Sequence, residues 1–216
     1  RPLQMFRGLR GAAGTRAAVD LLRAVRLDER YLDRLPSQLS GGEKQRVGIA
    51  RAFATQPDLI VCDEPVSALD VSVQAAILNL LGELQARDRT AYVFISHDMS
   101  VVRYLADRVA VLYLGRVCEA GPVERVFTPP WHPYTEALLS AIPVPDPDAE
   151  VNPIRLEGPV PSAAVKIDGC PFHTRCPRKL GEICSREAPP TQVGPDGHTI
   201  VCHIPLAELA RIGSQP

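Results

Sequence analysis

A strand, helix, strand pattern between residues 59 and 96 constrains the fold of this chain more than any other feature. The run 59–62 (LIVC) has strand length and no polar alternation, which is typical of a parallel strand buried on both faces, and 91–96 (AYVFIS) fits a second buried strand. Between them, apolar residues recur at helical spacing from Val71 to Leu84. Because such a crossover is nearly always right-handed and leaves its strands parallel, the pattern predicts an α/β fold.

Three side chains suited to acid, base or phosphate chemistry follow these two strands. Asp63 and Glu64 end the first strand, and His97 follows the second. Ligands of open α/β sheets bind at the carboxyl edge of the strands. There, Asp63 could hold Mg²⁺, Glu64 could orient and deprotonate an attacking water, and His97 could donate a hydrogen bond to a γ-phosphate oxygen. The alternative for an acidic pair after a strand is a helix cap or a solvated turn.

The stretch LSGGEKQR, residues 39–46, has the features of an anion-binding helix start. Ser40 precedes Glu43 by three residues, which is the capping-box pattern, and the predicted helix ends before Pro57. Gly41 and Gly42 permit close approach, and the free amides and the positive dipole end of such a helix favour an anion. The 216 residues nevertheless contain no G-x-x-x-x-G-K-[ST] loop that would hold a nucleotide phosphate within the same chain.

Charge and hydropathy argue against nucleic-acid binding and against a membrane-spanning helix. Lys plus Arg number 24 against 25 Asp plus Glu, and this balance disfavours nucleic-acid binding. No apolar run reaches the roughly 20 residues that a membrane-spanning helix needs, and the first residues lack the apolar core of a signal peptide. These features predict a cytosolic chain, which can still dock on a membrane protein.

The stretches LSGGEKQR, LIVCDEP, SALD and SHD closely resemble, in this order and spacing, the signature motif, Walker B strand, D-loop and switch histidine of the ATP-binding-cassette (ABC) ATPases. The resemblance implies a P-loop ATPase fold with a helical subdomain and a parallel sheet core. It implies that Asp63 binds Mg²⁺, Glu64 is the catalytic base and His97 senses the γ-phosphate. Ser40, Gly41, Gly42 and, in the D-loop, Asp70 would contact ATP across the interface with a second ABC ATPase subunit.

The chain lacks the Walker A loop of that family, so we expect it to be the carboxyl-terminal part of a longer ATPase. One alternative is a non-catalytic chain that contributes only its signature motif to a partner ATPase. A DNA-repair or chromosome-maintenance cassette is a further rival. Such proteins usually insert long coiled coils or zinc modules between the motifs, and here the signature runs into the Walker B strand without an insertion.

Longer stretches, among them HPYTEALLSAIP and the tail from GCPFHTRCP to VCH, resemble the ATPases of bacterial dipeptide and oligopeptide importers. The resemblance implies a peripheral ATPase on the cytoplasmic face of the membrane. Its partners would be the second cassette, identical or homologous, two membrane permease subunits and an extracytoplasmic substrate-binding protein. Transport of nickel or another small solute is the alternative, because similar ATPases serve those transporters.

Proline-rich sequence after Thr128 predicts a domain boundary near residue 129. Residues 1–128 would form the partial ATPase domain, in which a hairpin around Leu114 and Gly115 closes the sheet, and residues 129–216 a small loop-rich domain. Four cysteines lie in this second part: Cys170, Cys176, Cys184 and Cys202. Their spacing matches none of the common zinc patterns. The family resemblance favours a [4Fe–4S] cluster, with Zn²⁺ as the runner-up and four reduced, buried thiols as the alternative.

Overall fold

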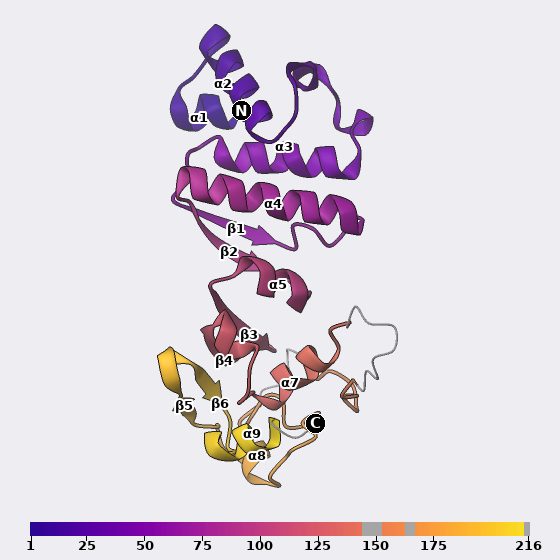
Figure 1. Ribbon diagram of the computed structural model, residues 1–216, viewed down its shortest axis with the longest axis vertical. Helices are drawn as coiled ribbons and strands as arrows, with labels where there is room; N and C mark the ends of the chain where they lie inside the picture. The colour runs from indigo at the N-terminus through magenta and orange to yellow at the C-terminus, as the bar shows by residue number, and fades with distance from the viewer. Residues whose placement is uncertain (144–152, 163–166, 214–216) are drawn as a thin grey trace. The chain divides into compact units, whose positions relative to one another are not determined.

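The computed structural model describes residues 1–143, 153–162 and 167–213. Its elements are mixed α and β (Figure 1), and in chain order they are α1 (Pro2–Arg7), α2 (Gly11–Ala24), η1 (Glu29–Asp33), η2 (Pro36–Gln38), α3 (Gly41–Phe53), β1 (Leu59–Asp63), α4 (Val71–Asp88), β2 (Ala91–Ile95), α5 (Met99–Leu105), β3 (Arg108–Tyr113), β4 (Arg116–Pro122), α6 (Val123–Val126), α7 (Pro133–Ser140), α8 (Ile183–Arg186), β5 (Thr191–Val193), η3 (Pro195–Gly197), β6 (Thr199–Val201) and α9 (Leu206–Gly213). In this described part of the chain, no helix is both long enough and apolar enough to cross a membrane.

The chain forms two compact units, Arg1–His97 and Asp98–Pro216. The boundary expected near residue 129 falls inside the second unit, between α6 and α7. The domain boundary near residue 129 stays a prediction, because a compact unit of the structure need not coincide with a domain as families define it.

The predicted strand, helix, strand pattern is confirmed in the first unit. β1 and β2 pair in parallel, from Leu59 opposite Ala91 to Asp63 opposite Ile95. α4 forms the connection, and the hydroxyl of Tyr92 on β2 donates a hydrogen bond to the Leu81 carbonyl of α4 at 2.9 Å. The parallel pairing places the carboxyl ends of both strands at one edge of the sheet.

One face of this two-stranded sheet is covered by helices. The ring of Tyr92 meets the ring of Phe53 of α3 edge-on, with centroids 6.5 Å apart, and α3 and α4 lie side by side (Figure 1). Residues that alternate with the covered ones point to the opposite face and are 47–62% exposed: Leu59, Val61, Val93 and Ile95. The prediction of burial on both faces is therefore wrong for the described chain, because the helices of this unit pack on one face and successive strand residues point to opposite faces.

The second unit is built on a four-stranded antiparallel sheet in the order β3, β4, β6, β5. The predicted hairpin is present, and Leu114 and Gly115 at its turn take the left-handed conformation (φ 48° and 74°) that tight two-residue hairpins require. It does not close the first sheet as expected. Instead β4 pairs with β6, where Ala120 lies opposite Thr199, because the β5–β6 hairpin offers its own free edge to β4.

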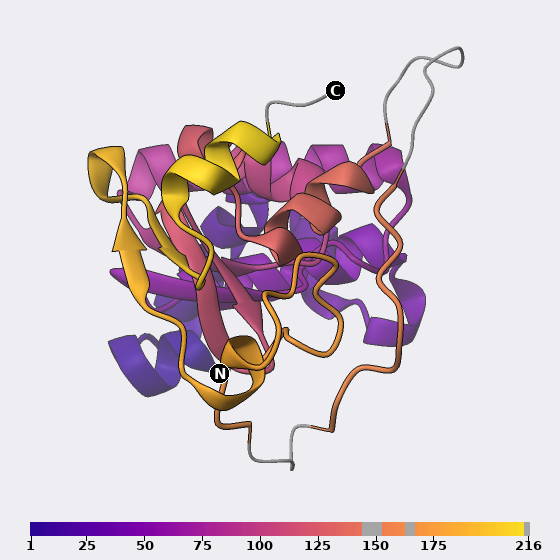
Figure 2. The ribbon, with the colours of Figure 1, turned by 90° about the horizontal axis from the view of Figure 1, so that it is seen from below.

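Aromatic and aliphatic side chains form the core of this second unit. The rings of Tyr113 and Phe172 meet at 5.1 Å between centroids, and those of Tyr134 and Phe172 at 5.2 Å. Val126 is fully buried beside them. The described residues between 153 and 182 form turns and loops without a regular helix or strand, as the orange segment of Figure 2 shows. Phe172 therefore ties a loop to the sheet.

Candidate functional site

The carboxyl edge of the β1–β2 sheet brings two of the predicted residues into contact. His97 Nδ1 lies 2.7 Å from Glu64 Oε1, and the Glu64 amide donates to the Ile95 carbonyl at 3.0 Å. Glu64 has φ 46°, a left-handed conformation that is uncommon for a residue with a side chain and that turns the backbone at the strand end. The side chains of Glu64 and His97 are 37% and 77% exposed, so water reaches both. Such a pair can bind and polarise a water molecule.

Asp63 is the last residue of β1, directly before Glu64, and it is exposed. A carboxylate at this edge is a ligand type that Mg²⁺ prefers. The residues present therefore suit the predicted magnesium site, and its occupancy stays a prediction.

The signature stretch forms the start of α3, as predicted. Ser40 caps the helix, accepting a hydrogen bond from the Glu43 amide at 3.3 Å, and the Glu43 carboxylate accepts the Ser40 amide at 2.7 Å. Gly41 lies against Leu69, just before α4, and Gly42 lies against Val73 in the first turn of α4. A Cβ on Gly42 would lie 2.7 Å from Val73 Cγ1, which is too close for any side chain without a shift of the helices. The glycines thus permit the close approach of the two helix starts.

Asp70 lies at the same place, as the N-cap of α4. Its Oδ1 accepts hydrogen bonds from the Ser72 hydroxyl at 2.7 Å and from the Val73 amide at 2.9 Å, and these bonds hold the pKa of Asp70 below its usual value. The structure therefore brings the signature residues and Asp70 together at one end of α3 and α4. A role of Asp70 in contacting ATP stays a prediction.

Tyr31 of η1 is a residue of this region that the sequence analysis missed. Its hydroxyl donates to Glu43 Oε1 at 2.5 Å. Tyr31 lies in a short helix of only five residues with no helical repeat, so no periodic pattern marks it. Tyr31 and Glu43 are 12 residues apart in sequence, and only folding brings their side chains into contact.

The four predicted metal-binding cysteines all lie in the second unit as free thiols, three buried and Cys176 half-buried. The Cys170 amide donates to the Cys184 carbonyl at 2.8 Å, which joins two of the cysteine segments. Burial, with a smaller contribution from the neighbouring cysteines, raises the pKa of Cys176 and of Cys202 to about 11. Among the described residues no three His, Cys, Asp or Glu side chains are arranged as metal ligands. Four thiols in one unit are nevertheless a donor set that suits a metal.

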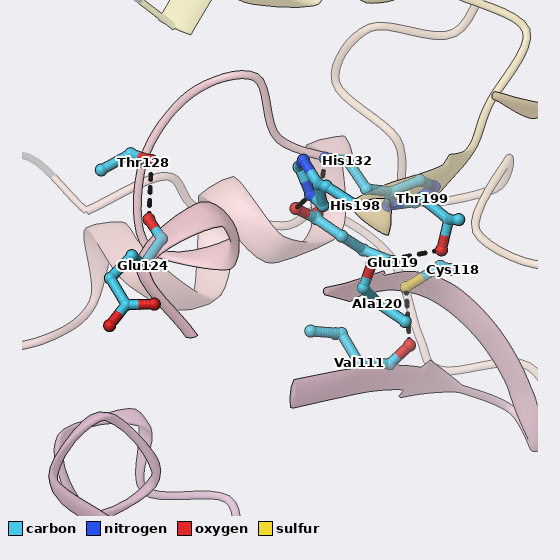
Figure 3. Close-up of polar contacts among 9 residues, drawn as sticks. All are labelled: Val111, Cys118, Glu119, Ala120, Glu124, Thr128, His132, His198 and Thr199. Carbon is cyan, nitrogen blue, oxygen red and sulfur yellow. Dashed lines mark hydrogen bonds and ion pairs between the residues drawn. The ribbon is translucent and has the colours of Figure 1, made fainter. Parts of the chain in front are cut away.

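A buried polar network in the second unit was also missed (Figure 3). Glu119 of β4 is fully buried, and its two carboxylate oxygens contact His198 Nε2 and the His132 amide, each at 2.8 Å. The hydroxyl of Thr199 donates to the Ala120 carbonyl at 3.1 Å alongside. Three segments of the chain meet at this carboxylate: β4, the start of α7 and the turn before β6. His198 is buried and contacts Glu119 through Nε2.

His132 caps α7 with its side chain. Nδ1 accepts the Tyr134 amide at 3.1 Å, so this nitrogen carries no hydrogen, and burial lowers the pKa of His132 to about 4. We expect the free energy of unfolding to fall by about 2 kcal/mol between pH 7 and pH 5, because His132 takes up a proton in the unfolded chain near pH 6.5 but resists it in the folded one.

Urea unfolding at both pH values measures this effect, with His132→Asn as the matched variant. Asn can still cap the helix but does not titrate, so its loss of stability between the two pH values should be smaller by about that amount. An equal loss in both proteins would show that His132 does not titrate as described.

Two family models match the chain. The model described as "ABC transporter" matches residues 10–67, which include the signature stretch, β1 and Glu64. The model described as "Oligopeptide/dipeptide transporter, C-terminal region" matches residues 118–184, which include Glu119 and three of the four cysteines.

Curated relatives match most of the chain. A probable peptide ABC transporter ATP-binding protein from Sinorhizobium fredii is 49% identical over 203 residues, covering 94% of this chain and 57% of the relative. The oligopeptide transport ATP-binding protein AppF of Bacillus subtilis is 46% identical, covering 86% of this chain and 56% of AppF. The chain therefore spans a little over half the length of these relatives.

Among solved structures, an ABC transporter in an inward-facing conformation is similar to this chain. It has 28% sequence identity and a TM-score of 0.53, with 59% of this chain and 53% of the other covered. This likeness and the family match confirm the predicted fold class, a mixed α/β part of an ABC-type ATPase domain.

Proposed function

We propose that this chain, which belongs to the ATP-binding proteins of peptide ABC transporters, is part of a subunit that hydrolyses ATP to drive the uptake of dipeptides or oligopeptides. The observation that carries the proposal is the contact between Glu64 and His97 at the carboxyl edge of the β1–β2 sheet. An exposed carboxylate oriented by a histidine is suited to positioning and deprotonating water for attack on a phosphoryl group.

The roles at this edge follow from its chemistry. Asp63 would hold Mg²⁺, and the ion would neutralise the negative charge that develops on the phosphates. Glu64 accepts the proton of the attacking water. His97 contacts the Glu64 carboxylate through Nδ1, and we propose that it donates a hydrogen bond to a γ-phosphate oxygen when nucleotide binds.

We propose that Ser40, Gly41, Gly42 and Asp70 act on ATP held by a second cassette, identical or homologous. Small residues at a helix start allow a phosphate to come close to the α3 amides. The alternative, a chain that supplies this motif to a partner without hydrolysing ATP itself, does not explain why Glu64 and His97 are placed in contact.

The further partners would be two membrane permease subunits and an extracytoplasmic substrate-binding protein, with this chain on the cytoplasmic face of the membrane. The proposal rests on the names of the relatives, which describe peptide transport and ATP binding. It is tested by peptide uptake in cells that lack the gene. Uptake of a labelled peptide should be lost and should return with the wild-type gene, whereas loss of nickel uptake with peptide uptake unchanged would favour the small-solute alternative.

We also propose that Cys170, Cys176, Cys184 and Cys202 hold a [4Fe–4S] cluster, with Zn²⁺ as the alternative. All four are free thiols in one unit, and each of Cys170, Cys184 and Cys202 is close enough for its charge to raise the pKa of Cys176. Metal binding would offset the cost of forming thiolates in this buried setting and would fasten a loop-rich region.

Iron, zinc and acid-labile sulfide measured in anaerobically purified native protein test this assignment. We expect about four iron and four sulfide per chain, with loss of both in Cys184→Ser. Cys118→Ser is the matched control, because Cys118 is buried on β4 and donates its thiol hydrogen to the Val111 carbonyl at 3.2 Å. Zinc without iron would show a zinc site in place of the cluster. The absence of both metals from the protein would contradict both assignments.

A further inference from the structure

The Glu43 carboxylate receives hydrogen bonds from two directions. From the start of α3, the Ser40 amide donates to Oε2 at 2.7 Å and the Ser40 hydroxyl donates to Oε2 at 2.8 Å. From η1, the Tyr31 hydroxyl donates to Oε1 at 2.5 Å. Tyr31 therefore satisfies the oxygen that the capping box leaves free.

The charge state of this group is fixed by the same contacts. The Tyr31 hydroxyl, followed by the Ser40 amide and hydroxyl, lowers the pKa of Glu43 to about 2, so the carboxylate stays ionised at any physiological pH. Arg30 adds a smaller contribution of the same sign, and its guanidinium lies 5.6 Å from the centroid of the Tyr31 ring. An anionic Glu43 is a strong acceptor that attracts the Ser40 hydroxyl hydrogen.

This arrangement has a consequence for Ser40. Its one hydroxyl hydrogen is donated to Glu43, and its oxygen accepts the Glu43 amide at 3.3 Å. To donate to a phosphate oxygen, the hydroxyl must turn away from Glu43. After that turn Glu43 keeps two donors, the Ser40 amide and the Tyr31 hydroxyl, whereas without Tyr31 it would keep the amide alone.

We infer that Tyr31 is a positioning residue for the signature serine: by holding the Glu43 carboxylate, it lets the Ser40 hydroxyl turn from Glu43 to a nucleotide phosphate. The inference rests on the proposed function, because it takes ATP as the ligand of Ser40. Tyr31 does not itself contact the nucleotide in this account. Tyr31 lowers the free-energy cost of breaking the hydrogen bond from the Ser40 hydroxyl to Glu43. A carboxylate that keeps two hydrogen-bond donors is destabilised less by the loss of a third.

The test is Tyr31→Phe in the native protein, with steady-state ATP hydrolysis as the readout. Phenylalanine keeps the ring beside Arg30 and removes the hydroxyl. We expect the ATP concentration for half-maximal hydrolysis to rise about fivefold, as loss of one such bond predicts, with kcat within about twofold of wild type. Tyr104→Phe is the matched control, because Tyr104 is 65% exposed on α5 in the other unit, and it should leave both constants unchanged.

The same substitution is then made in a Ser40→Ala background. If Tyr31 acts through Ser40, adding Tyr31→Phe to Ser40→Ala produces no further rise in the half-maximal ATP concentration. An equal rise in both backgrounds would mean that Tyr31 acts independently of Ser40 and would overturn the inference. The inference would also be overturned if Ser40→Ala raised the half-maximal ATP concentration and Tyr31→Phe left it unchanged. In both cases the proposed function stands.

Failure of the proposed function gives a different result. If neither Ser40→Ala nor Glu64→Gln changes ATP hydrolysis, then this chain does not act on ATP as proposed, and the inference about Tyr31 falls with it. The Glu64→Gln measurement therefore distinguishes failure of the inference about Tyr31 from failure of the proposed function.

Discussion

ATP hydrolysis by the native protein is expected to fall about a thousandfold when Glu64 is replaced by Gln, with ATP binding retained. Gln keeps the size of the side chain and can still contact His97, which lies 2.7 Å from Glu64 Oε1. It cannot accept a proton from water at neutral pH, so the step that consumes ATP slows while the contacts that bind ATP remain. Phosphate release and bound nucleotide, measured on the same preparation, separate the two effects.

Glu29→Gln provides the matched control for this result. Glu29 lies in the same unit, in η1, and is exposed, and it has no place in the proposed chemistry. Its substitution should leave the rate within about twofold of wild type. Hydrolysis at the wild-type rate in Glu64→Gln would remove Glu64 from the role of catalytic base.

The second large effect concerns stability. Replacing Glu119 by Ala should lower the free energy of unfolding by about 4 kcal/mol, because the His132 amide and the His198 ring nitrogen both lose their buried acceptor and a cavity is left. Glu119→Gln should cost less, since its amide oxygen can satisfy one of these groups. Urea unfolding followed by circular dichroism measures both values at pH 7.

Glu124→Ala is the matched control for Glu119. Figure 3 shows both residues, and Glu124 of α6 is exposed whereas Glu119 is fully buried. The control should change stability by less than about 0.5 kcal/mol. A loss below about 1 kcal/mol in Glu119→Ala would show that the buried network does not hold the three segments of the second unit together.

Local patterns in the sequence were sufficient to predict the strand, helix, strand pattern of the first unit and the start of α3. The apolar run of β1, the helical repeat of α4 and the parallel partner β2 follow one another, so the chain itself dictates their pairing. From that pairing, the proximity of Glu64 and His97 could be predicted before any coordinates. The capping box at Ser40 and Glu43 was predicted equally well, because it depends on residues three positions apart.

Long-range contacts explain what the sequence did not reveal. Glu119 is a charged strand residue that would ordinarily face solvent, and its burial depends on His198, 79 residues further along. The pairing of β4 with β6 has the same range, and β6 is only three residues long, so it gives a weak strand signal. The exposed face of the β1–β2 sheet was missed because an apolar run reports hydrophobicity, not which element covers it.

A double-mutant cycle on Glu64 and His97 shows whether the two side chains in contact at the sheet edge act as one hydrolytic unit. The rates of ATP hydrolysis are measured for Glu64→Gln, His97→Ala and the double variant of the native protein. We expect each single substitution to slow hydrolysis strongly and the double variant to be no slower than the slower single variant. Two effects that multiply in the double variant, or a His97→Ala rate equal to wild type, would contradict this expectation.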